Sequence, residues 1–357
     1  MKTLSPRSPR SLSLLCSPRS PCSRRSPAKP HAAGAAIIAA AAAVALVTVL
    51  ALPGTARAQQ KFPLKPIRVV VAFSAGGTSD ILARIITQGM GEAWGQPIVI
   101  EPRPGAGGTL AATIVAKAAP DGYTLLATSG SFPISAVTGA NLQYDVLRDF
   151  ATVGEIGYGT QVIVVSPALG AKTVKEFVAY ANARPGKIFF GSTGALTSTH
   201  LSTERFRNAV GIRAQHVGFK GQVEYVIEIV ADRVQFGAPG LMVALPLIRD
   251  GKLVPLVVAT PQRSPLLPDV PTAQEVAPGW GRDGSQAWLA PAGTPRAIRQ
   301  QISKEMARNL ALPEVKTRLQ NMGFFIAPAS PEEHEKNLRA DIEIFSRLVK
   351  ELGMTAK

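Results

Sequence analysis

Residues 67–85 read IRVVVAFSAGGTSDILARI, and this stretch decides the fold that the 357-residue sequence predicts. Ile67 to Ala72 is a continuous β-branched and apolar run, which is typical of a strand buried on both faces in a parallel sheet. A loop of glycine and hydroxyl residues follows it. After the loop, apolar residues at helical spacing form one stripe, at Ile81, Leu82, Ile85, Ile86 and Met90. Strand, short loop and helix in this order predict a parallel α/β unit.

The same alternation of strand and helix continues along the chain. Further strands are expected over residues 97–101, 123–128, 161–166, 187–190, 234–237 and 253–259. Further helices are expected over residues 109–119, 173–183, 200–209, 222–231, 295–310 and 331–352. This alternation predicts an α/β fold of two lobes, each a mostly parallel sheet flanked by helices, with chain crossings near Thr160 and Thr260. A single larger α/β domain fits the same pattern.

Residues 1–58 have the pattern of an export signal that is cleaved after Ala58. A basic, Ser/Pro/Arg-rich start precedes an apolar run over residues 32–52, and Ala56-Arg57-Ala58 is a small-x-small sequence that signal peptidases accept. We therefore expect a mature protein in the periplasm. A retained membrane anchor is the alternative, because the apolar run is just long enough to span a bilayer.

The formal net charge of +15 is concentrated in this leader, which holds eight Lys or Arg and no Asp or Glu. The remaining residues carry 31 basic and 24 acidic side chains, a mild excess that does not indicate nucleic-acid binding. Both cysteines, Cys16 and Cys22, also lie in the leader. Disulfide and thiol chemistry are therefore excluded from the predicted mature protein.

The loop at Ser74–Thr78 would expose several backbone N–H groups at the start of a helix. Helix N-termini favour negative charge, so a carboxylate or phosphate is the expected ligand group. Gly76 and Gly77 fit this role, because a Cβ would hold an anion away from the backbone. Asp80 either stabilises the first helical turn or receives an amino or hydroxyl group of the ligand. A plain turn without a ligand fits this loop equally well.

Residues 191–200, GSTGALTSTH, form a second strand-to-helix loop of glycines and hydroxyls. Two such loops, one in each lobe, would form an anion clamp, with Ser129-Gly130-Ser131 as a third wall. His200 either bonds the anion or caps its helix. The ligand-binding candidates from these three loops are Ser74, Ala75, Gly76, Gly77, Thr78, Asp80, Ser129, Ser131, Ser192, Thr193, Gly194, Thr197, Ser198 and His200.

Other chemistries have weaker signals. PGAGGT at residues 104–109 is interpreted as a tight turn, because position 110 is Leu where the dinucleotide fingerprint needs glycine. The predicted mature chain has three histidines, none at a metal-binding spacing, so neither a metal nor a cofactor is expected. No enzyme activity is expected either. An exported serine hydrolase that pairs Ser192 with His200 or His216 is an alternative without a recognisable motif.

Several longer segments resemble the substrate-binding proteins of tripartite tricarboxylate transporters, also called Bug receptors. They are PIRVVVAFSAGGTSDILARI, GQPIVIEPRPGAGGTLAATIVAKAAPDGYTLLATSGS, GSTGALTSTHLSTE, LIRDGKL, SPLLPDVPTAQE and LAPAGTP, in the family's order from about Phe62 to the C-terminus. The resemblance implies a periplasmic, two-lobed receptor of the type II binding-protein fold that closes on a small carboxylated metabolite. It also implies that backbone amides and ordered waters at Ser74–Asp80 and Ser192–His200 hold the carboxylate.

The sequence also departs from the family pattern. Ser74 stands where many members have Pro, and Gly218-Phe219 stands where many have Pro-Tyr. FGAPGL at residues 236–241 lacks an Asp that some relatives carry. These departures leave the far end of the ligand open, with Phe219, Lys220, Ala238 and Pro239 as weaker candidates for it.

The predicted protein is thus a monomeric receptor that delivers a small organic acid to the membrane subunits of a tripartite transporter. A receptor that feeds a signalling partner is the alternative. The expected organisation is a signal peptide over residues 1–58, the first part of lobe 1 over 59–160, lobe 2 over 161–259, and the second part of lobe 1 with the C-terminal helices over 260–357.

Overall fold

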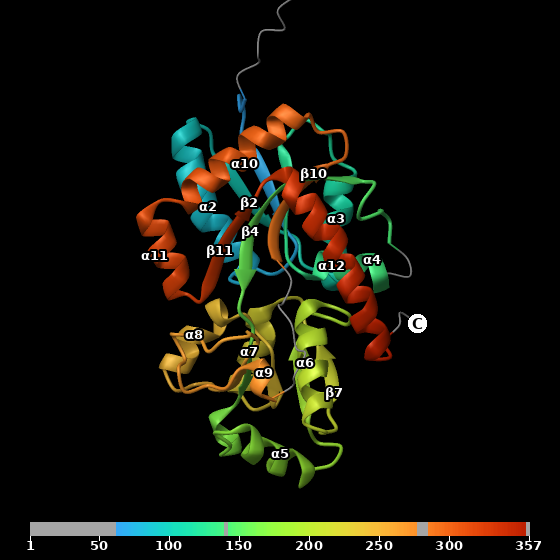
Figure 1. Cartoon of the computed structure of the whole chain (residues 1–357), viewed down its shortest axis with the longest axis vertical. Coiled ribbons are helices and arrows are strands. Elements are labelled where there is room, and N and C mark those ends of the chain that lie inside the picture. Colours follow the sequence, from blue (N-terminus) through green and yellow to red (C-terminus); the bar gives the residue numbers. More distant parts are fainter. Residues whose placement is uncertain (1–61, 139–141, 277–284, 355–357) are drawn as a thin grey trace, which may run out of the picture. The chain divides into compact units, whose positions relative to one another are not determined.

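The computed structural model describes residues 62–138, 142–276 and 285–354. The predicted signal peptide therefore lies outside the described residues. Within the described ranges, no helix is both long enough and apolar enough to cross a bilayer. The described residues form two lobes, each built on one β-sheet (Figure 1).

A six-stranded sheet forms the first lobe, in the order β11-β4-β10-β3-β1-β2. Its strands are β1 (Ile67–Val71), β2 (Ile98–Pro102), β3 (Thr124–Thr128), β4 (Phe150–Gly159), β10 (Ser285–Pro291) and β11 (Phe324–Ala329). Its helices are α2 (Thr78–Trp94), α3 (Thr109–Ala116), α4 (Ser131–Thr138), α10 (Arg296–Leu310), α11 (Pro313–Asn321) and α12 (Pro331–Glu351), and a 3-10 turn, η1, spans Ala106–Gly108.

The period-two geometry of β1 explains why both faces of this sheet are covered. Ile67, Val69 and Val71 point to one face and pack with α2, α10 and α11. Val70 points to the other face and packs with α3, α4 and α12. The continuous apolar run of the sequence is thus explained by burial on both sides.

A five-stranded sheet forms the second lobe, in the order β7-β6-β8-β5-β9. Its strands are β5 (Val162–Val165), β6 (Phe189–Ser192), β7 (Gln215–Gly218), β8 (Phe236–Gly237) and β9 (Val254–Val258). Its helices are α5 (Val174–Asn182), α6 (Ser198–Ala209), α7 (Gln222–Val230), α8 (Leu241–Arg249) and α9 (Ala273–Val276), and a 3-10 turn, η2, spans Pro167–Leu169. Helices α5 and α6 cover one face of this sheet, and α7 and α8 cover the other.

The two-lobed α/β fold is confirmed, but both sheets are mixed rather than mostly parallel. In the first sheet, β1 pairs in parallel with β2 and β3, whereas β10 and β11 pair antiparallel with their neighbours. In the second sheet, β6 pairs in parallel with β7 and β8, whereas β5 pairs antiparallel with β8 and β9. Strands β5 and β10 each follow a chain crossing, where the chain enters a sheet from the other lobe rather than through a βαβ unit, and both pair antiparallel with their neighbours. Strand β11 follows β10 through α10 and α11 and pairs antiparallel with β4.

The first crossing lies between Gly159, where β4 ends in one sheet, and Val162, where β5 starts in the other. The second lies later than Thr260. Residues after β9 stay with the second lobe: Leu267 belongs to its core, and Thr272 bridges Val258. The chain therefore reaches the first sheet between Val276 and Ser285, so the boundary predicted at residue 260 is wrong by at least one short helix.

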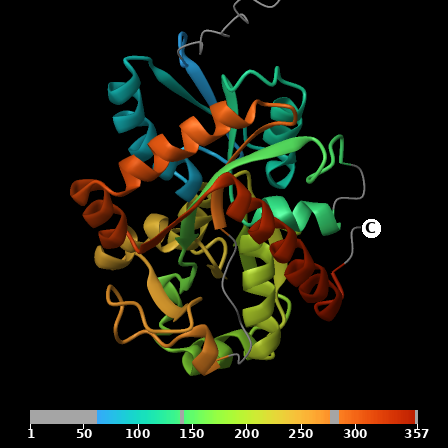
Figure 2. The ribbon, with the colours of Figure 1, turned by 45° about the horizontal axis from the view of Figure 1, so that its top comes forward.

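An apolar cluster joins the two lobes beside the crossings. Leu201 of α6 packs with Ile134 of α4 and with Phe345, Leu348 and Val349 of α12. Figure 2 shows the C-terminal part of α12 running alongside α4 and down beside α6. This contact brings the N-terminal ends of α4 and α6 together, which matters for the site.

Candidate functional site

A small cavity lies between the lobes at the N-terminal ends of five helices. The lining includes Thr78 of α2, Ser131 of α4, Ser198 of α6 and Gln222 of α7, and Gly240, the N-cap of α8. The remaining lining residues are Phe73, Gly77, Ser79, Ser129, Gly130, Gly159, Gln161, Thr193, Thr199 and Gln286. The volume of this cavity is about 30 Å³, which holds roughly two water molecules or a carboxylate group.

No charged side chain is among the described residues that line this cavity. Its field therefore comes from hydroxyls, amides and the positive ends of the helices. Each helix N-terminus favours an anion by about 0.3–1 kcal/mol when exposed and by up to about 2 kcal/mol when partly buried. The arrangement suits a group with a single negative charge and several acceptor lone pairs.

The first loop, between β1 and α2, presents its backbone. Gly76 has φ 77°, a left-handed conformation that glycine adopts without strain, and the Gly77 N–H bonds the Ser74 carbonyl at 3.3 Å. The first intrahelical bond runs from the Ile81 N–H to the Gly77 carbonyl. The N–H groups of Thr78 and Ser79 precede that bond, so they are available to the cavity that both residues line.

Asp80 holds this loop rather than lining the cavity. Its carboxylate is 2% exposed and accepts the Gly76 N–H at 2.9 Å. It also forms a two-point pair with Arg84, at 2.9 and 3.0 Å. Asp80 thus has a role that the sequence did not suggest: it bonds the preceding loop through Gly76 and the next turn of α2 through Arg84.

The second loop, between β6 and α6, uses most of its hydroxyls on itself. The Thr197 hydroxyl donates to the Gly194 carbonyl at 2.7 Å, and the Thr193 hydroxyl lies 3.1 Å from Thr197 Oγ1 and 2.9 Å from Thr199 Oγ1. The Thr193 N–H donates to Thr199 Oγ1 at 3.0 Å. Thr193, Ser198 and Thr199 reach the cavity, whereas Thr197 does not.

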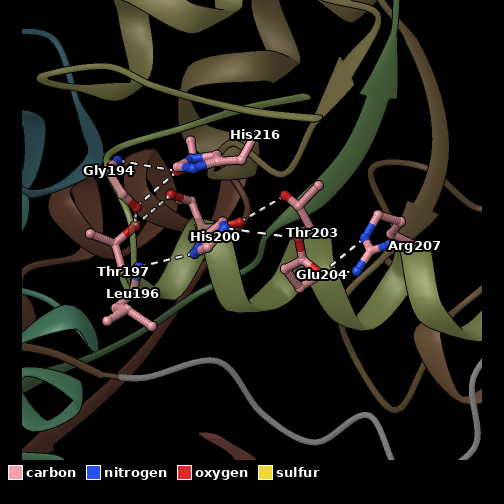
Figure 3. Close-up of polar contacts among 10 residues, drawn as sticks. Gly194, Leu196, Thr197, His200, Thr203, Glu204, Arg207 and His216 are labelled. Atoms are coloured by element: carbon pink, nitrogen blue, oxygen red, sulfur yellow. Dashed lines mark hydrogen bonds and ion pairs between the residues drawn. The ribbon is translucent and has the colours of Figure 1, made fainter. Parts of the chain in front are cut away.

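Two histidines, His200 and His216, lie against each other beside this loop, with their rings tilted by 32° (Figure 3). The rings of His200 and His216 are 4.0 Å apart, and His200 Nδ1 accepts the N–H of Leu196 at 2.9 Å. Burial, with the nearby His216 and Arg207, lowers the pKa of His200 to about 3. Burial also lowers the pKa of His216 to about 4. Both rings are therefore neutral at neutral pH and act as hydrogen-bonding scaffold.

The third loop, at Ser129–Ser131, joins the lobes. The Ser131 hydroxyl accepts the Ser198 N–H at 3.1 Å and lies 3.3 Å from the Ser198 hydroxyl. On the opposite side of the cavity, the Thr78 hydroxyl donates to Gln222 Oε1 at 3.3 Å. The cavity is thus bounded by hydrogen bonds between the lobes as well as by backbone.

A second, larger cavity of about 620 Å³ meets the first at Thr193, which lines both. It lies between the lobes and includes Gly194, Phe219, Lys220 and Glu224. Its remaining lining residues are Gly105, Ala106, Gly107, Ala195 and Gly218. Glu224 accepts a hydrogen bond from the Ser74 hydroxyl, so the first loop is bonded to a residue that lines this cavity.

The structure brings together only part of the predicted site. Six candidates line the central cavity: Gly77, Thr78, Ser129, Ser131, Thr193 and Ser198. Gly194, Phe219 and Lys220 line the second cavity. The other nine do not line either one: Ser74, Ala75, Gly76, Asp80, Ser192, Thr197, His200, Ala238 and Pro239. Ala238, a candidate for the far end of the ligand, is fully buried in the core of the second lobe, and Gly240, two residues later, lines the central cavity.

Sequence reasoning missed the three glutamines that line the cavity. Gln161 stands at the first crossing, Gln222 starts α7, and Gln286 lies in the otherwise apolar strand β10. A signal existed for two of them, because Gln161 and Gln286 are polar residues in predicted or actual buried runs, where an unexplained polar side chain indicates function. The sequence also did not reveal that the PGAGGT turn lies at the site. Gly105, Ala106 and Gly107 line the second cavity, and Gly107 lies 3.7 Å from the position that a Cβ on Gly194 would take.

The geometry does not support hydrolysis at Ser192. Its Oγ lies 2.6 Å from His216 Nε2, but the side chain is fully buried and is also bonded to the backbone of Gly194. The lowered pKa makes His216 a weak general base. Across the described part of the chain, no group of three or more His, Cys, Asp or Glu side chains is placed to hold a metal ion.

Comparison with known sequences places the chain beside one family of transporter receptors. The profile of the family described as "Tripartite tricarboxylate transporter family receptor" matches residues 82–354. A protein of Bordetella bronchiseptica that is assigned to the UPF0065 family is 31% identical over 302 residues, which cover 84% of this chain and 90% of that protein.

Solved structures give the same result. The protein Rpa4515 of R. palustris, solved with adipate, is 30% identical with a TM-score of 0.79, and the match covers 83% of this chain and all of that one. MatC of Rhodopseudomonas palustris, solved with bound malate, is 30% identical with a TM-score of 0.76 and covers 81% of this chain and all of its own.

Proposed function

The chain belongs to the family of tripartite tricarboxylate transporter receptors, and we propose that it binds a small carboxylated metabolite between its two lobes. Receptors of this family are periplasmic solute-binding proteins, and two structural relatives hold adipate and malate. The single observation that carries the proposal is the convergence of five helix N-termini on a cavity whose described lining has no charged side chain.

The carboxylate group enters the central cavity, and the rest of the ligand extends past Thr193 toward the second cavity. The central cavity, at about 30 Å³, fits the charged head but not a whole dicarboxylate. The second, at about 620 Å³, has the size of an ordinary ligand pocket. Movement of the lobes about the two crossings would admit the ligand.

Binding of this kind needs no salt bridge at the carboxylate. Micromolar affinity corresponds to about 8 kcal/mol. Hydrogen bonds to a charged group contribute about 1.5–3 kcal/mol each, so a few donors around one carboxylate supply it after the ordering cost. The mild basic excess outside the leader, 31 basic against 24 acidic residues, attracts the anion at long range.

The remaining features of the proposal concern location and partners. Residues 1–58 act as a signal peptide cleaved after Ala58, and the exported monomer passes its ligand to the membrane subunits of a transporter without chemical change. N-terminal sequencing of the exported protein tests the first part, and Gln59 as its first residue is the expected result.

A screen of small carboxylates by thermal shift and calorimetry tests the binding. A ligand that binds only the folded protein raises its Tm, by RT ln(1 + [L]/Kd) in free energy. We expect at least one mono-, di- or tricarboxylate to raise the Tm, and its neutral primary amide to give no rise. A screen in which no organic acid binds would overturn the proposal.

A further inference from the structure

One residue that lines the central cavity has a buried polar atom without a hydrogen-bond partner. The atom is Oε1 of Gln161, which finds no donor among the described residues, and the side chain is 8% exposed. Gln161 lines the central cavity from the first chain crossing. A buried acceptor without a donor is destabilising, so we expect a ligand in the cavity to supply a hydrogen-bond donor to this oxygen.

The other two glutamines of the cavity differ from Gln161 in this respect. Gln222 Oε1 accepts the Gly240 N–H at 2.9 Å, and Gln286 Oε1 accepts the Ser79 hydroxyl at 2.7 Å. Each of these two oxygens already has a donor, whereas Gln161 Oε1 has none. Gln222 and Gln286 also carry NH₂ groups, which can donate to a carboxylate.

The backbone of Gln161 is fixed, so the side chain starts from a defined place. Its carbonyl accepts the Ala259 N–H at 2.8 Å, and the residue bridges Gly240 on the opposite side. The next residue, Val162, donates its N–H to Pro239 at 2.9 Å. The crossing strand is thus held on both sides beside the cavity.

A carboxylate cannot satisfy Gln161 Oε1, because an ionised carboxylate only accepts hydrogen bonds. The cavity is small, so a donor that reaches this oxygen must lie close to the carboxylate that fills the rest of it. We propose that the ligand carries an O–H or N–H donor on the carbon next to its carboxylate and that Gln161 accepts it. This inference rests on the proposed function and narrows the ligand class to 2-hydroxy and 2-amino acids.

Matched ligand pairs test this on the unaltered protein. Calorimetry with malate and succinate, and with lactate and propionate, compares acids that differ only in the 2-hydroxyl. We expect the 2-hydroxy acid of a pair to bind at least about tenfold more tightly, the ratio for one buried acceptor left without a donor. Alanine should match lactate, whereas 3-hydroxypropionate should match propionate because its donor is one carbon too far.

Two substitutions assign the effect to one side chain. Gln161→Met keeps the length and volume but removes the acceptor, and it should reduce the hydroxy-to-deoxy ratio to about one. Gln286→Met is the matched control: it removes an NH₂ donor, so it should weaken both acids of a pair equally and leave their ratio unchanged. The Tm of each variant without ligand reports whether it folds.

The outcomes separate this inference from the proposed function. If no acid of the set binds the unaltered protein, both fall. If hydroxy and deoxy acids bind the unaltered protein equally, carboxylate binding stands but the inference about Gln161 is rejected. This result does not require the variants. An equal loss for both acids in Gln161→Met also overturns it, because Gln161 would then act as a donor to the carboxylate.

Discussion

The two strand-to-helix loops that meet at the cavity have similar sequences but are built differently. The β1–α2 loop relies on glycine backbone and on one buried carboxylate, Asp80, that holds Gly76. The β6–α6 loop relies on a network of hydroxyls over two neutral histidines. One presents its backbone to the cavity, and the other uses most of its polar side chains on its own conformation.

This difference shows that a hydroxyl-rich loop is not the same as a ligand-binding surface. Ser192 and Thr197 are as polar as Ser198, yet only Ser198 lines the cavity. The hydroxyls of the first two are bonded within the loop, and the Ser198 N–H bonds Ser131 in the other lobe. Substitutions in the first loop should therefore affect binding, and those in the second should affect stability.

Gly77→Val should have the largest effect. Gly77 lines the cavity, and its φ of −76° and ψ of 167° are allowed for valine. A Cβ there would lie 3.3 Å from the Ser74 carbonyl oxygen, so the loop has to shift by a few tenths of an ångström. The branched side chain would fill a cavity of about 30 Å³, and overpacking of this kind implies a loss of affinity of at least about 100-fold. Calorimetry with a carboxylate that binds the unaltered protein measures this loss.

Ala75→Val provides the control, because Ala75 lies in the same loop but is exposed and does not line the cavity. It should leave affinity within about twofold, as expected of a surface change. Gly77→Val with full affinity would mean that the carboxylate does not use the first loop, and the comparison of the two loops would lose its basis.

Asp80→Ala should have the next largest effect, because it should lower both the unfolding free energy and the affinity for the ligand. It removes the acceptor for the Gly76 N–H and for Arg84, at a cost of about 2 kcal/mol in unfolding free energy. Affinity should fall several-fold because the loop is less ordered. Urea unfolding and calorimetry measure the two losses. Arg84→Gln removes only the half-exposed partner and should cost less than about 1 kcal/mol.

A different combination of losses in Asp80→Ala would contradict the view that Asp80 only stabilises the first loop. If affinity were lost while unfolding free energy stayed constant, Asp80 would contact the ligand directly. That outcome would give the first loop a side-chain contribution to binding, which its described geometry does not include.

Much of the fold follows from the sequence because the parallel units are strongly patterned. The run at β1 is apolar throughout, and the stripe of α2 has clear helical spacing. Strands β4, β7, β10 and β11 were not predicted. β10 (SQAWLAP) starts with two polar residues and ends with a proline. β4 (FATVGEIGYG) contains three glycines, β7 (QHVG) is short and half polar, and β11 (FFIAPA) contains a proline at the edge of its sheet. Their pairing comes from the tertiary structure rather than from local preference.

The candidate site was predicted less completely for a related reason. Sequence identifies which loops end strands and start helices, and three such loops do meet at the cavity. It does not reveal which hydroxyls of a loop are bonded within it. It also cannot bring Gln161 and Gln286 together, because Gln161 lies at the first crossing and Gln286 in β10, and their proximity depends on how the chain passes between the sheets.

Ser192→Ala should affect stability and leave binding nearly unchanged. The Ser192 hydroxyl is fully buried, accepts the Gly194 N–H at 3.1 Å and contacts His216 at 2.6 Å. Loss of these bonds should lower unfolding free energy by about 1–2 kcal/mol, measured by urea unfolding, with affinity within about twofold. Ester hydrolysis by the unaltered protein that disappears in the variant would instead favour the hydrolase alternative.

His200→Asn should have the smallest effect, and only the pH dependence of stability should reveal it. Asn Oδ1 can replace Nδ1 as the acceptor for the Leu196 N–H. The pKa of His200 is about 3 in the folded protein and about 6.5 in an unfolded chain, so below pH 6.5 the unfolded state takes up a proton that the folded state refuses. Its stabilisation is therefore complete above pH 6.5 and is lost as the pH falls toward 3.

Between pH 7 and 5.5 this linkage amounts to about 1 kcal/mol for one histidine. Urea unfolding at pH 7 and at pH 5.5 should therefore show that His200→Asn loses about 1 kcal/mol less unfolding free energy over this change than the unaltered protein does. His334→Asn is the matched comparison: burial lowers the pKa of His334 to about 4, and it lies in α12, away from the second loop. It should also lose about 1 kcal/mol less unfolding free energy than the unaltered protein. Identical losses in His200→Asn and the unaltered protein would mean that His200 takes up protons while folded. The second loop would then rest on a charged pair rather than on two neutral rings.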